Sequence, residues 1–253
     1  MDTTNKNYEF TGETMEYKGR MLHRIRSTKK DPNGFFQSGE LGGWIESPHN
    51  LRDEAWVGGN AKVYGESVVM DRAYVGGDSQ IHKRSIIRDD TFISGHVEVI
   101  ESEVNGDSDV GGHSSIISSY VGGFSRVSGH AQIRHSSVSN VTIYDNACIE
   151  RIVLLGDYEI CGDAFVTNSK NLIYGTIYTN FDYKYFFYTT KSGQFTGNVG
   201  CWRGTPEELL TMAQSDKWVD SRPENIAESR EELVALANLL LARERRLDLG
   251  KNV

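Results

Sequence analysis

The fold is decided by residues 55–99, which read AWVGGN-AKVYGE-SVVMDR-AYVGGD-SQIHKR-SIIRDD-TFISGH-VEV. The first position of each six-residue unit holds Ala, Ser, Thr or, once, Val, and the third position always holds Val or Ile. Twenty such pairs follow one another up to residue 166. All twenty second members are Val, Ile or Leu, and sixteen first members are Ala, Ser or Thr. A short period sustained over this length indicates a repeat architecture.

Each six-residue unit predicts one short strand and one turn. Residues two apart in a strand face the same side, so the small and the aliphatic residue of each pair point inward together. The three remaining residues, such as Gly58-Gly59-Asn60, are of types that form turns and tolerate positive φ. Three such units then make one triangular coil with three strands and three turns. At the usual strand spacing of about 4.8 Å, about six and a half coils would form a rod about 30 Å tall.

Breaks in the period support the coil. The step between inward aliphatic residues falls from six to five at residues 99–104, 116–121 and 133–138. These steps are one coil apart, so each removes a residue from the same corner and shortens its coil by one residue. We assign Val153 and Leu155 as the next inward pair. Two later short steps, at residues 138–143 and 155–160, then fall at a different corner and predict less regular last coils.

The repeat resembles the hexapeptide-repeat family of left-handed parallel β-helices. The resemblance covers about 45% of the chain and implies a mainly β, triangular solenoid with 17–18 residues per coil. Acyltransferases, carbonic anhydrases and proteins without catalytic activity share this fold, so the resemblance implies architecture and not one activity.

We expect three parts in the chain. Residues 1–54 should form an N-terminal strand and capping segment, with residues 1–15 loosely attached and a strand over residues 17–27. Residues 55–170 should form the β-helix, and 171–253 a small α+β module with an aromatic β hairpin and two helices. An open solenoid end exposes apolar groups, so we expect Trp44 and Leu51 to cover the first coil.

The two C-terminal helices have start signals. Thr205 is placed as an N-cap, Pro206 at the first helical position and Glu208 as the partner in a capping box. Ser229 begins a second signal of this kind. The second helix carries an apolar stripe that packs either on its own module or on another molecule. The stripe consists of Leu233, Leu236, Leu240 and Leu247.

Two short motifs resemble phage and prophage proteins. The segment Leu-Gly-Gly-Trp-Ile-Glu at residues 41–46 resembles the N-terminal cap of a group of such β-helix proteins. The segment Cys-Trp-Arg-Gly-Thr at residues 201–205 resembles a C-terminal module of phage proteins. These resemblances imply a protein of a mobile element that binds a host or phage protein. The candidate partner-binding residues are Arg24, Arg26, Trp202, Arg203, Leu233, Leu236 and Leu240.

The composition indicates the cellular environment of the protein and disfavours some classes of partner. The net charge is −8 and the isoelectric point is near 5.4, which disfavours nonspecific binding to nucleic acid or to an anionic membrane. The polar N-terminus resembles no signal peptide, and the three cysteines form no CxxC motif. We therefore expect a cytoplasmic, reduced protein without a membrane or nucleic-acid partner.

Three histidines recur with the coil period. His96, His113 and His130 are separated by one shortened coil each and should stack as a column on one corner, after Asn60 and Asp78 in earlier coils. One interpretation is conformational, because Asn, Asp and His are enriched at positive φ. The other is chemical, because histidine serves as a metal ligand and as a general base.

Two enzymatic alternatives stay open beside a non-catalytic role. Carbonic anhydrases of this fold use three histidines with spacing similar to His96, His130 and His135, which implies a zinc site, although the register here departs by one residue. Acyltransferases of this fold carry a long loop, and residues 55–166 contain no such insertion. We expect a non-catalytic scaffold without cofactor or metal that forms a homotrimer. The alternatives are a trimeric acyl-CoA-dependent acyltransferase and a zinc-dependent hydratase.

Overall fold

The computed structural model describes residues 7–32, 34–178, 182–215 and 223–249. The chain forms two compact units, residues 1–157 and residues 158–253. We call them the β-helix unit and the C-terminal unit. No helix in the described residues is long and apolar enough to cross a membrane. All three cysteines are free thiols.

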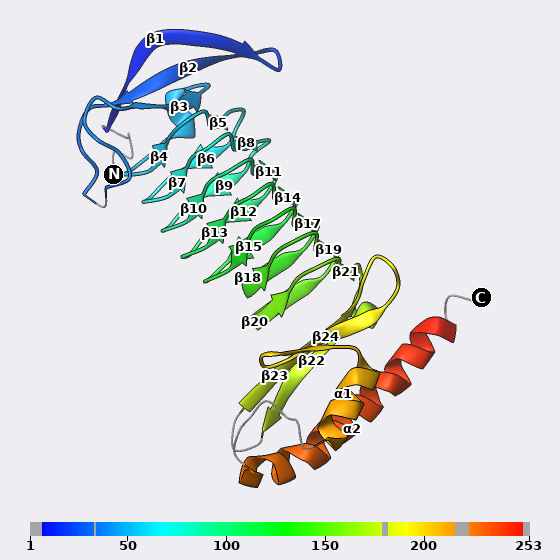
Figure 1. The fold of residues 1–253 in the computed structure, drawn as a ribbon. Coiled ribbons are helices and arrows are strands. Elements are labelled where there is room, and N and C mark those ends of the chain that lie inside the picture. Colours follow the sequence, from blue (N-terminus) through cyan, green and yellow to red (C-terminus); the bar gives the residue numbers. More distant parts are fainter. Residues whose placement is uncertain (1–6, 33, 179–181, 216–222, 250–253) are drawn as a thin grey trace. The chain divides into compact units, whose positions relative to one another are not determined.

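The β-helix unit is a stack of coils with three strand-bearing faces (Figure 1). Face A contains β5 (Lys62–Val63), β8 (Gln80–His82), β11 (Glu98–Ile100), β14 (Ser115–Ile117), β17 (Gln132–Arg134) and β19 (Cys148–Glu150). Face B contains β6 (Val68–Val69), β9 (Ile86–Ile87), β12 (Glu103–Val104) and β15 (Tyr120–Gly122). Face C contains β4 (Trp56–Val57), β7 (Tyr74–Val75), β10 (Phe92–Ile93), β13 (Asp109–Val110) and β16 (Arg126–Val127). The longer β18 (Ser137–Ile143) pairs with β15 and then with β16, so it joins faces B and C.

The parallel register confirms the predicted fold class. Trp56 pairs with Tyr74 and Tyr74 with Phe92, and the partners of each pair are separated by three full six-residue units. Phe92 pairs with Asp109, which is one residue closer in sequence, as the shortened coils require. The solenoid has about seven turns, and two helices follow it in the sequence. The predicted inward aliphatics fill its axis: Val63, Ile81, Val99, Ile116 and Ile133 are all fully buried.

Serines in the inward small position satisfy backbone groups at the corner between faces A and B. Ser85, Ser102 and Ser119 are buried, and each hydroxyl accepts a hydrogen bond from the N–H one coil further on, at 3.0–3.3 Å. Each hydroxyl also donates to a carbonyl two or three residues before it, at 2.7 Å. Buried polar atoms need hydrogen-bond partners. The serine hydroxyls supply those partners to the backbone at this corner, whereas alanine is sufficient at a corner where the backbone groups pair with one another.

The last coil departs from the assignment made on the sequence. Leu154 is fully buried and Ile152 is 9% exposed, whereas Val153 and Leu155 are each 61% exposed. The predicted inward pair of Val153 and Leu155 is therefore wrong by one residue. The step from Ile149 to the buried Leu154 is again the short one, so the shortened corner continues through a fourth coil.

The N-terminal segment belongs to the β-helix unit and extends face A at its first edge. The antiparallel hairpin of β1 (Tyr8–Tyr17) and β2 (Arg20–Ser27) pairs with β3 (Leu41–Ile45), which pairs in parallel with β5. The expectation of a loose start is wrong for β1, because its backbone is paired. Leu51 is 1% exposed and bridges to Val69 of the first coil, in agreement with its capping role. Trp44 is 8% exposed but stands in register with the outward Lys62 and packs with Leu22 and Tyr64, so the predicted capping role of its ring is not borne out.

Asn50 completes the cap at the end of the short 3-10 helix Pro48–Asn50. Its side chain is fully buried and donates hydrogen bonds to the carbonyl oxygens of Gly65 and Ser67, at 2.9 and 2.8 Å. It accepts one from the Ser47 N–H at 2.8 Å. Asn50 thereby replaces the hydrogen bonds that a preceding coil would supply to this corner.

The C-terminal unit contains a four-stranded antiparallel sheet and two helices. Its elements are β21 (Phe165–Val166), a 3-10 turn (Ser169–Asn171), β22 (Leu172–Tyr178), β23 (Asp182–Thr189), β24 (Phe195–Val199), β25 (Trp202–Gly204), α1 (Pro206–Gln214) and α2 (Pro223–Leu249). The strand β20 (Val153–Ile160) leads into this unit from the β-helix unit.

The helix start at residues 205–208 is confirmed. The Thr205 hydroxyl accepts a hydrogen bond from the Glu208 N–H at 3.3 Å, and the Glu208 carboxylate accepts one from the Thr205 N–H at 2.8 Å. The second helix begins at Pro223, ahead of the predicted start at Ser229.

Candidate functional site

A groove of about 820 Å³ follows the corner between faces A and B of the β-helix unit. Consecutive coils place one outward residue each at this corner, and we call the set the corner column. The corner column consists of Arg84, Glu101, Ser118, His135 and Arg151. The other wall is formed by outward residues of face B, among them Ile86, Glu103, Tyr120 and Val153.

From Glu101 onward the corner column lies where each coil has lost one residue, and the backbone of the whole column is left-handed. The φ angles of Glu101, Ser118, His135 and Arg151 are 50°, 48°, 49° and 55°, and Arg84 has φ 65°. This region costs a residue with a Cβ about 1–2 kcal/mol, and glycine avoids that cost. The chain nevertheless keeps side chains at these positions, four of them long and polar, and Glu101 is linked to the Ser118 hydroxyl at 3.3 Å.

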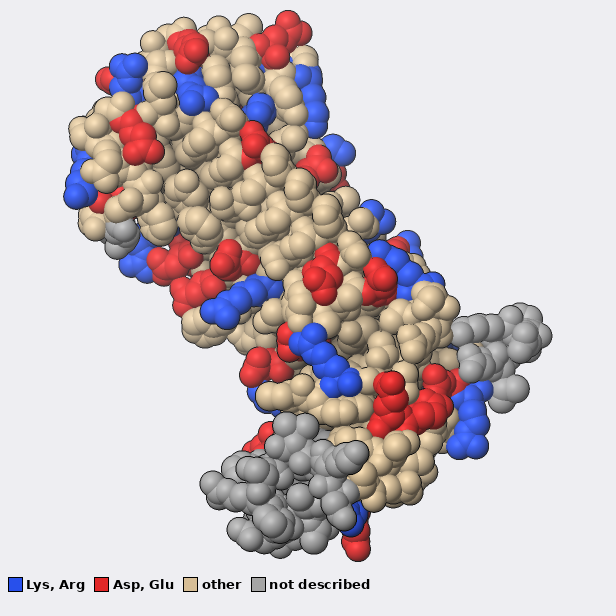
Figure 2. Space-filling model, in the orientation of Figure 1, with Lys and Arg blue, Asp and Glu red and all other residues tan. Residues whose placement is uncertain are grey.

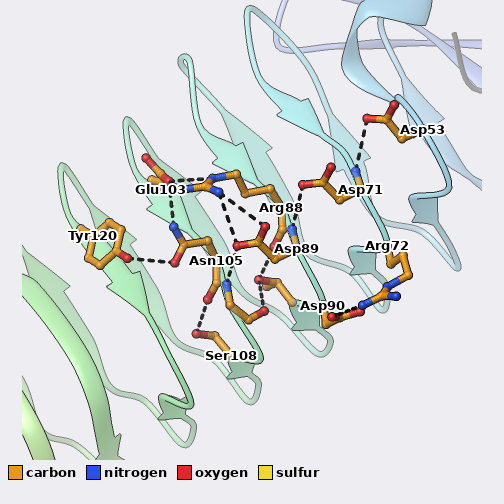
Figure 3. A network of polar contacts seen from close by, with 12 residues as sticks. Asp53, Asp71, Arg72, Arg88, Asp89, Asp90, Glu103, Asn105, Ser108 and Tyr120 are labelled. Atoms are coloured by element: carbon orange, nitrogen blue, oxygen red, sulfur yellow. Dashed lines mark hydrogen bonds and ion pairs between the residues drawn. The ribbon is translucent and has the colours of Figure 1, made fainter. Parts of the chain in front are cut away.

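A network of polar side chains holds the face B wall of the groove (Figure 3). The Arg88 guanidinium pairs with Glu103 at 2.7 Å, and the Asn105 amide donates to the same carboxylate at 2.9 Å. The Tyr120 hydroxyl then donates to the Asn105 carbonyl oxygen at 3.0 Å. This chain of contacts fixes the side chains of Glu103 and Tyr120 at the rim of the groove before any ligand arrives.

Charges of both signs surround the groove. Arg84 and Arg151 stand at its two ends, and Glu101 and Glu103 lie between them. On the face shown in Figure 2, acidic and basic side chains are interspersed and form no continuous basic stripe. A continuous basic stripe is the footprint expected for nucleic acid. The mixed charges that line the groove favour a ligand with charges of both signs.

The predicted histidine column forms at another corner, between faces C and A. The rings of His96 and His113 are stacked with centroids 4.6 Å apart, and those of His113 and His130 are 4.9 Å apart. All three side chains are exposed. His96 Nδ1 lies 3.6 Å from an oxygen of Asp78, whose other oxygen accepts a hydrogen bond from Asn60 at 3.2 Å.

The conformational explanation for this column is wrong. The positive φ angles belong to the preceding glycines, with 106° at Gly95, 66° at Gly112 and 68° at Gly129, and the three histidines have none. A Cβ on Gly112 would lie 2.5 Å from the Gly129 carbonyl oxygen, so the close approach of the coils also requires glycine. Backbone conformation therefore does not account for histidine at the next position.

His135 does not join the histidine column. It lies in the corner column, at a different corner from His130, with its own positive φ. In the part of the chain that the structure describes, no three His, Cys, Asp or Glu side chains are grouped closely enough to hold a metal ion. The structure thus does not bring together the three histidines whose spacing is similar to a carbonic anhydrase.

His82 is a buried histidine at the end of β8 that the sequence did not single out. It is 7% exposed, stacks on the Tyr64 ring at 4.9 Å and contacts Glu98 at 3.2 Å. Burial lowers the pKa of His82, and the contact with Glu98 opposes that shift only in part. His82 stacks on a ring of the preceding coil, and burial favours its neutral form, so a packing role fits this residue.

The candidate partner-binding residues are divided between the two units. In the β-helix unit, Arg26 is exposed and Arg24 lies over the Trp44 ring, 5.0 Å from its centroid. In the C-terminal unit, Arg203 is exposed and pairs with Glu159, and its Nη1 lies 3.1 Å from the Cys161 sulfur. Trp202 packs against the core of its own unit.

The leucine stripe of α2 packs within its own unit. Leu233, Leu236 and Leu240 are 2%, 6% and 0% exposed and lie in one core with Phe187 and Leu209. The stripe was predicted correctly as apolar, but these three leucines are covered by this chain and offer no surface to a partner.

The sequence did not reveal the groove. The residues of the corner column share no residue type, so no motif in the sequence marks them. The sequence marks the position only by the five-residue step, and in four of the coils the corner residue directly precedes the inward serine. No protein-family model matches this chain, and no curated protein matches it.

Proposed function

We propose that this protein is a non-catalytic β-helical scaffold, related to phage or prophage proteins, that binds a host or phage protein through the groove. One observation carries the proposal: four consecutive coils keep a side chain at a left-handed corner position that suits glycine. Local strain that the surrounding structure maintains is a recognised mark of functional positions. The side chains of Glu101, Ser118, His135 and Arg151 all line the same groove.

The dimensions of the groove suit an extended segment of another chain. Arg84 and Arg151 are four coils apart, about 19 Å at the usual strand spacing. An extended segment of about six residues has this length at about 3.3 Å per residue. The order of charges along the groove favours a segment with acidic groups near both ends and a basic or neutral middle.

A catalytic role has less support. A small-molecule site is usually a concave pocket that buries most of its ligand, with few placed polar groups. The groove is open, and the turns that border it are too short to close over a substrate. An acyltransferase would bind acetyl-CoA in calorimetry, and a hydratase would speed the hydration of carbon dioxide. We expect neither result, and either one would replace the scaffold proposal.

The test is a groove variant with Arg84→Ser, Glu101→Ser, His135→Ser and Arg151→Ser. Serine is tolerated at this corner, because Ser118 occupies it with φ 48°. The matched control carries Lys62→Ser, Asp109→Ser and Arg126→Ser, which removes the same charges from faces A and C. Complexes would be isolated from native host cells with each tagged protein.

We expect one partner to copurify with the natural protein and with the control, and to be lost from the groove variant. Melting curves should show that all three proteins are folded. A partner that stays on the groove variant would refute the groove as its binding site.

Self-association remains part of the proposal. Leu233, Leu236 and Leu240 of α2 are buried, so we assign the contacts between copies to exposed apolar side chains of the β-helix unit. Phe124 is 71% exposed and Leu155 is 61% exposed. We propose a homotrimer in the cytoplasm.

A further inference from the structure

The histidine column has a chemical use that the groove proposal does not involve. Three exposed imidazoles repeat at 4.6 and 4.9 Å along the solenoid, and the glycine before each of them already satisfies the conformation of the turn. The histidines are also exposed, so burial in the core does not explain them. We propose that neighbouring histidines of this column bind a divalent transition metal ion such as Ni²⁺, Cu²⁺ or Zn²⁺.

Imidazole nitrogen is a preferred ligand of these ions. The stacked rings are nearly parallel, at interplanar angles of 13° and 12°, so the ring nitrogens of neighbours do not yet converge on one point. The His96 side chain is 56% exposed, which leaves it free to turn about its side-chain bonds. Two adjacent rings that turn toward each other chelate one ion and leave the other coordination positions to water.

Asp78 provides the second argument. Metal-binding histidines usually donate their other ring N–H to a carboxylate, which fixes the tautomer and the ring orientation. Asp78 lies 3.6 Å from His96 Nδ1, and Asn60 holds the carboxylate from its far side at 3.2 Å. At 3.6 Å the carboxylate makes no direct hydrogen bond with His96 Nδ1, and a small turn of the exposed ring brings the two within hydrogen-bond distance. His96 and His113, the pair beside Asp78, therefore form the preferred pair.

His113 is the decisive residue because it belongs to both adjacent pairs. Without it, His96 and His130 are two coils apart, about 9.6 Å at the usual strand spacing, which is too far to share one ion. Loss of His130 leaves the preferred pair intact. The column therefore predicts a different effect for the two changes, although both remove one exposed histidine.

The test is calorimetric titration with Ni²⁺ alone, in a non-chelating buffer near pH 7.5. We expect one ion per chain, at least tenfold weaker binding in His113→Asn, and little change in His130→Asn or in the control His135→Asn. Asp78→Asn should weaken binding about 10-fold or more.

Folding is checked separately. Melting curves should be similar for all variants, and His113→Phe should keep the stacked ring while losing Ni²⁺. Absence of Ni²⁺ binding in the natural protein would overturn the proposal. Equal losses in His113→Asn and His135→Asn would overturn it as well, because both would then reflect isolated histidines.

Discussion

Replacing Gly112 by alanine should destabilise the solenoid much more than the same change at Gly65. Both glycines have nearly the same φ, 66° and 68°. A Cβ at Gly112 would lie 2.5 Å from the carbonyl oxygen and 2.7 Å from the nitrogen of Gly129 in the next coil. A Cβ at Gly65 would meet nothing closer than the Lys83 nitrogen at 3.7 Å.

The difference between these variants measures how tightly the coils are stacked. The left-handed backbone costs alanine about 1–2 kcal/mol at either position. Gly112→Ala adds the cost of separating two coils, about 1–3 kcal/mol for overpacking. A domain of this size loses about 2–4 °C in melting temperature per kcal/mol. We therefore expect a decrease of about 2–8 °C for Gly65→Ala and about 4–20 °C for Gly112→Ala.

The assay is thermal and urea unfolding followed by circular dichroism. Gly65→Ala is the matched control, because it contains the same backbone strain without the contact between coils. Equal decreases in the two variants would refute the stacking of Gly112 on Gly129.

Three further predictions concern register, pH and assembly. Inserting one residue between Val75 and Ile81 should turn the inward side chains of the following strands outward, at a cost of about 1.5–3 kcal/mol for each aliphatic side chain exposed. An unchanged melting curve would refute the assignment of these residues to a coil with an inward face. Burial lowers the pKa of His82 below its ordinary value, so the unfolded chain binds this proton more readily. The free energy of unfolding should be highest above pH 6.5 and fall as the pH drops from there toward the lowered pKa. When the pH is lowered from about 7.5 to about 5, the melting temperature of the His82→Phe variant should fall less than that of the natural protein. An equal fall in both proteins would show that other groups cause the pH dependence. Light scattering at micromolar concentration should give a trimer, and a monomer would contradict self-association.

The sequence predicted the inward faces of the solenoid because the side-chain period of a strand is strict. Ile81, Val99 and Ile116 could be assigned from position alone, and they are fully buried. The assignment failed at residues 152–155, which are all Ile, Val or Leu, because either phase of the alternation places an aliphatic pair inward. The structure selects Ile152 and Leu154, since that phase keeps the five-residue corner with Arg151 at φ 55°.

The ends of the chain were less predictable for separate reasons. The strand β1 reads YEFTGETMEY, and its few apolar residues alternate only weakly because it is an edge strand that buries little. The signal at Ser229 lies inside α2, where Pro223 already begins the helix. A capping pattern in sequence marks a compatible start, but an earlier proline at the first helical position takes precedence here.

The candidate site could be predicted only in part. The histidine column follows from the coil length, because positions separated by one whole coil must stack on each other. Its link to Asp78 depends on a side-chain orientation that spacing does not determine. The groove depends on which outward residues of two faces lie beside one corner. The change from six-residue to five-residue steps was visible in the sequence, but its left-handed backbone was not.

The central claim, that the groove binds another protein, is tested most directly by photo-crosslinking from within it. A photoreactive phenylalanine analogue at position 120 replaces one aromatic ring by another at the groove wall, and the same analogue at Phe92 on face C is the control. After irradiation of native host cells, we predict a crosslink from position 120 to one protein partner and none to that partner from position 92. Absence of a crosslink at position 120, or the same products from both positions, would contradict the account.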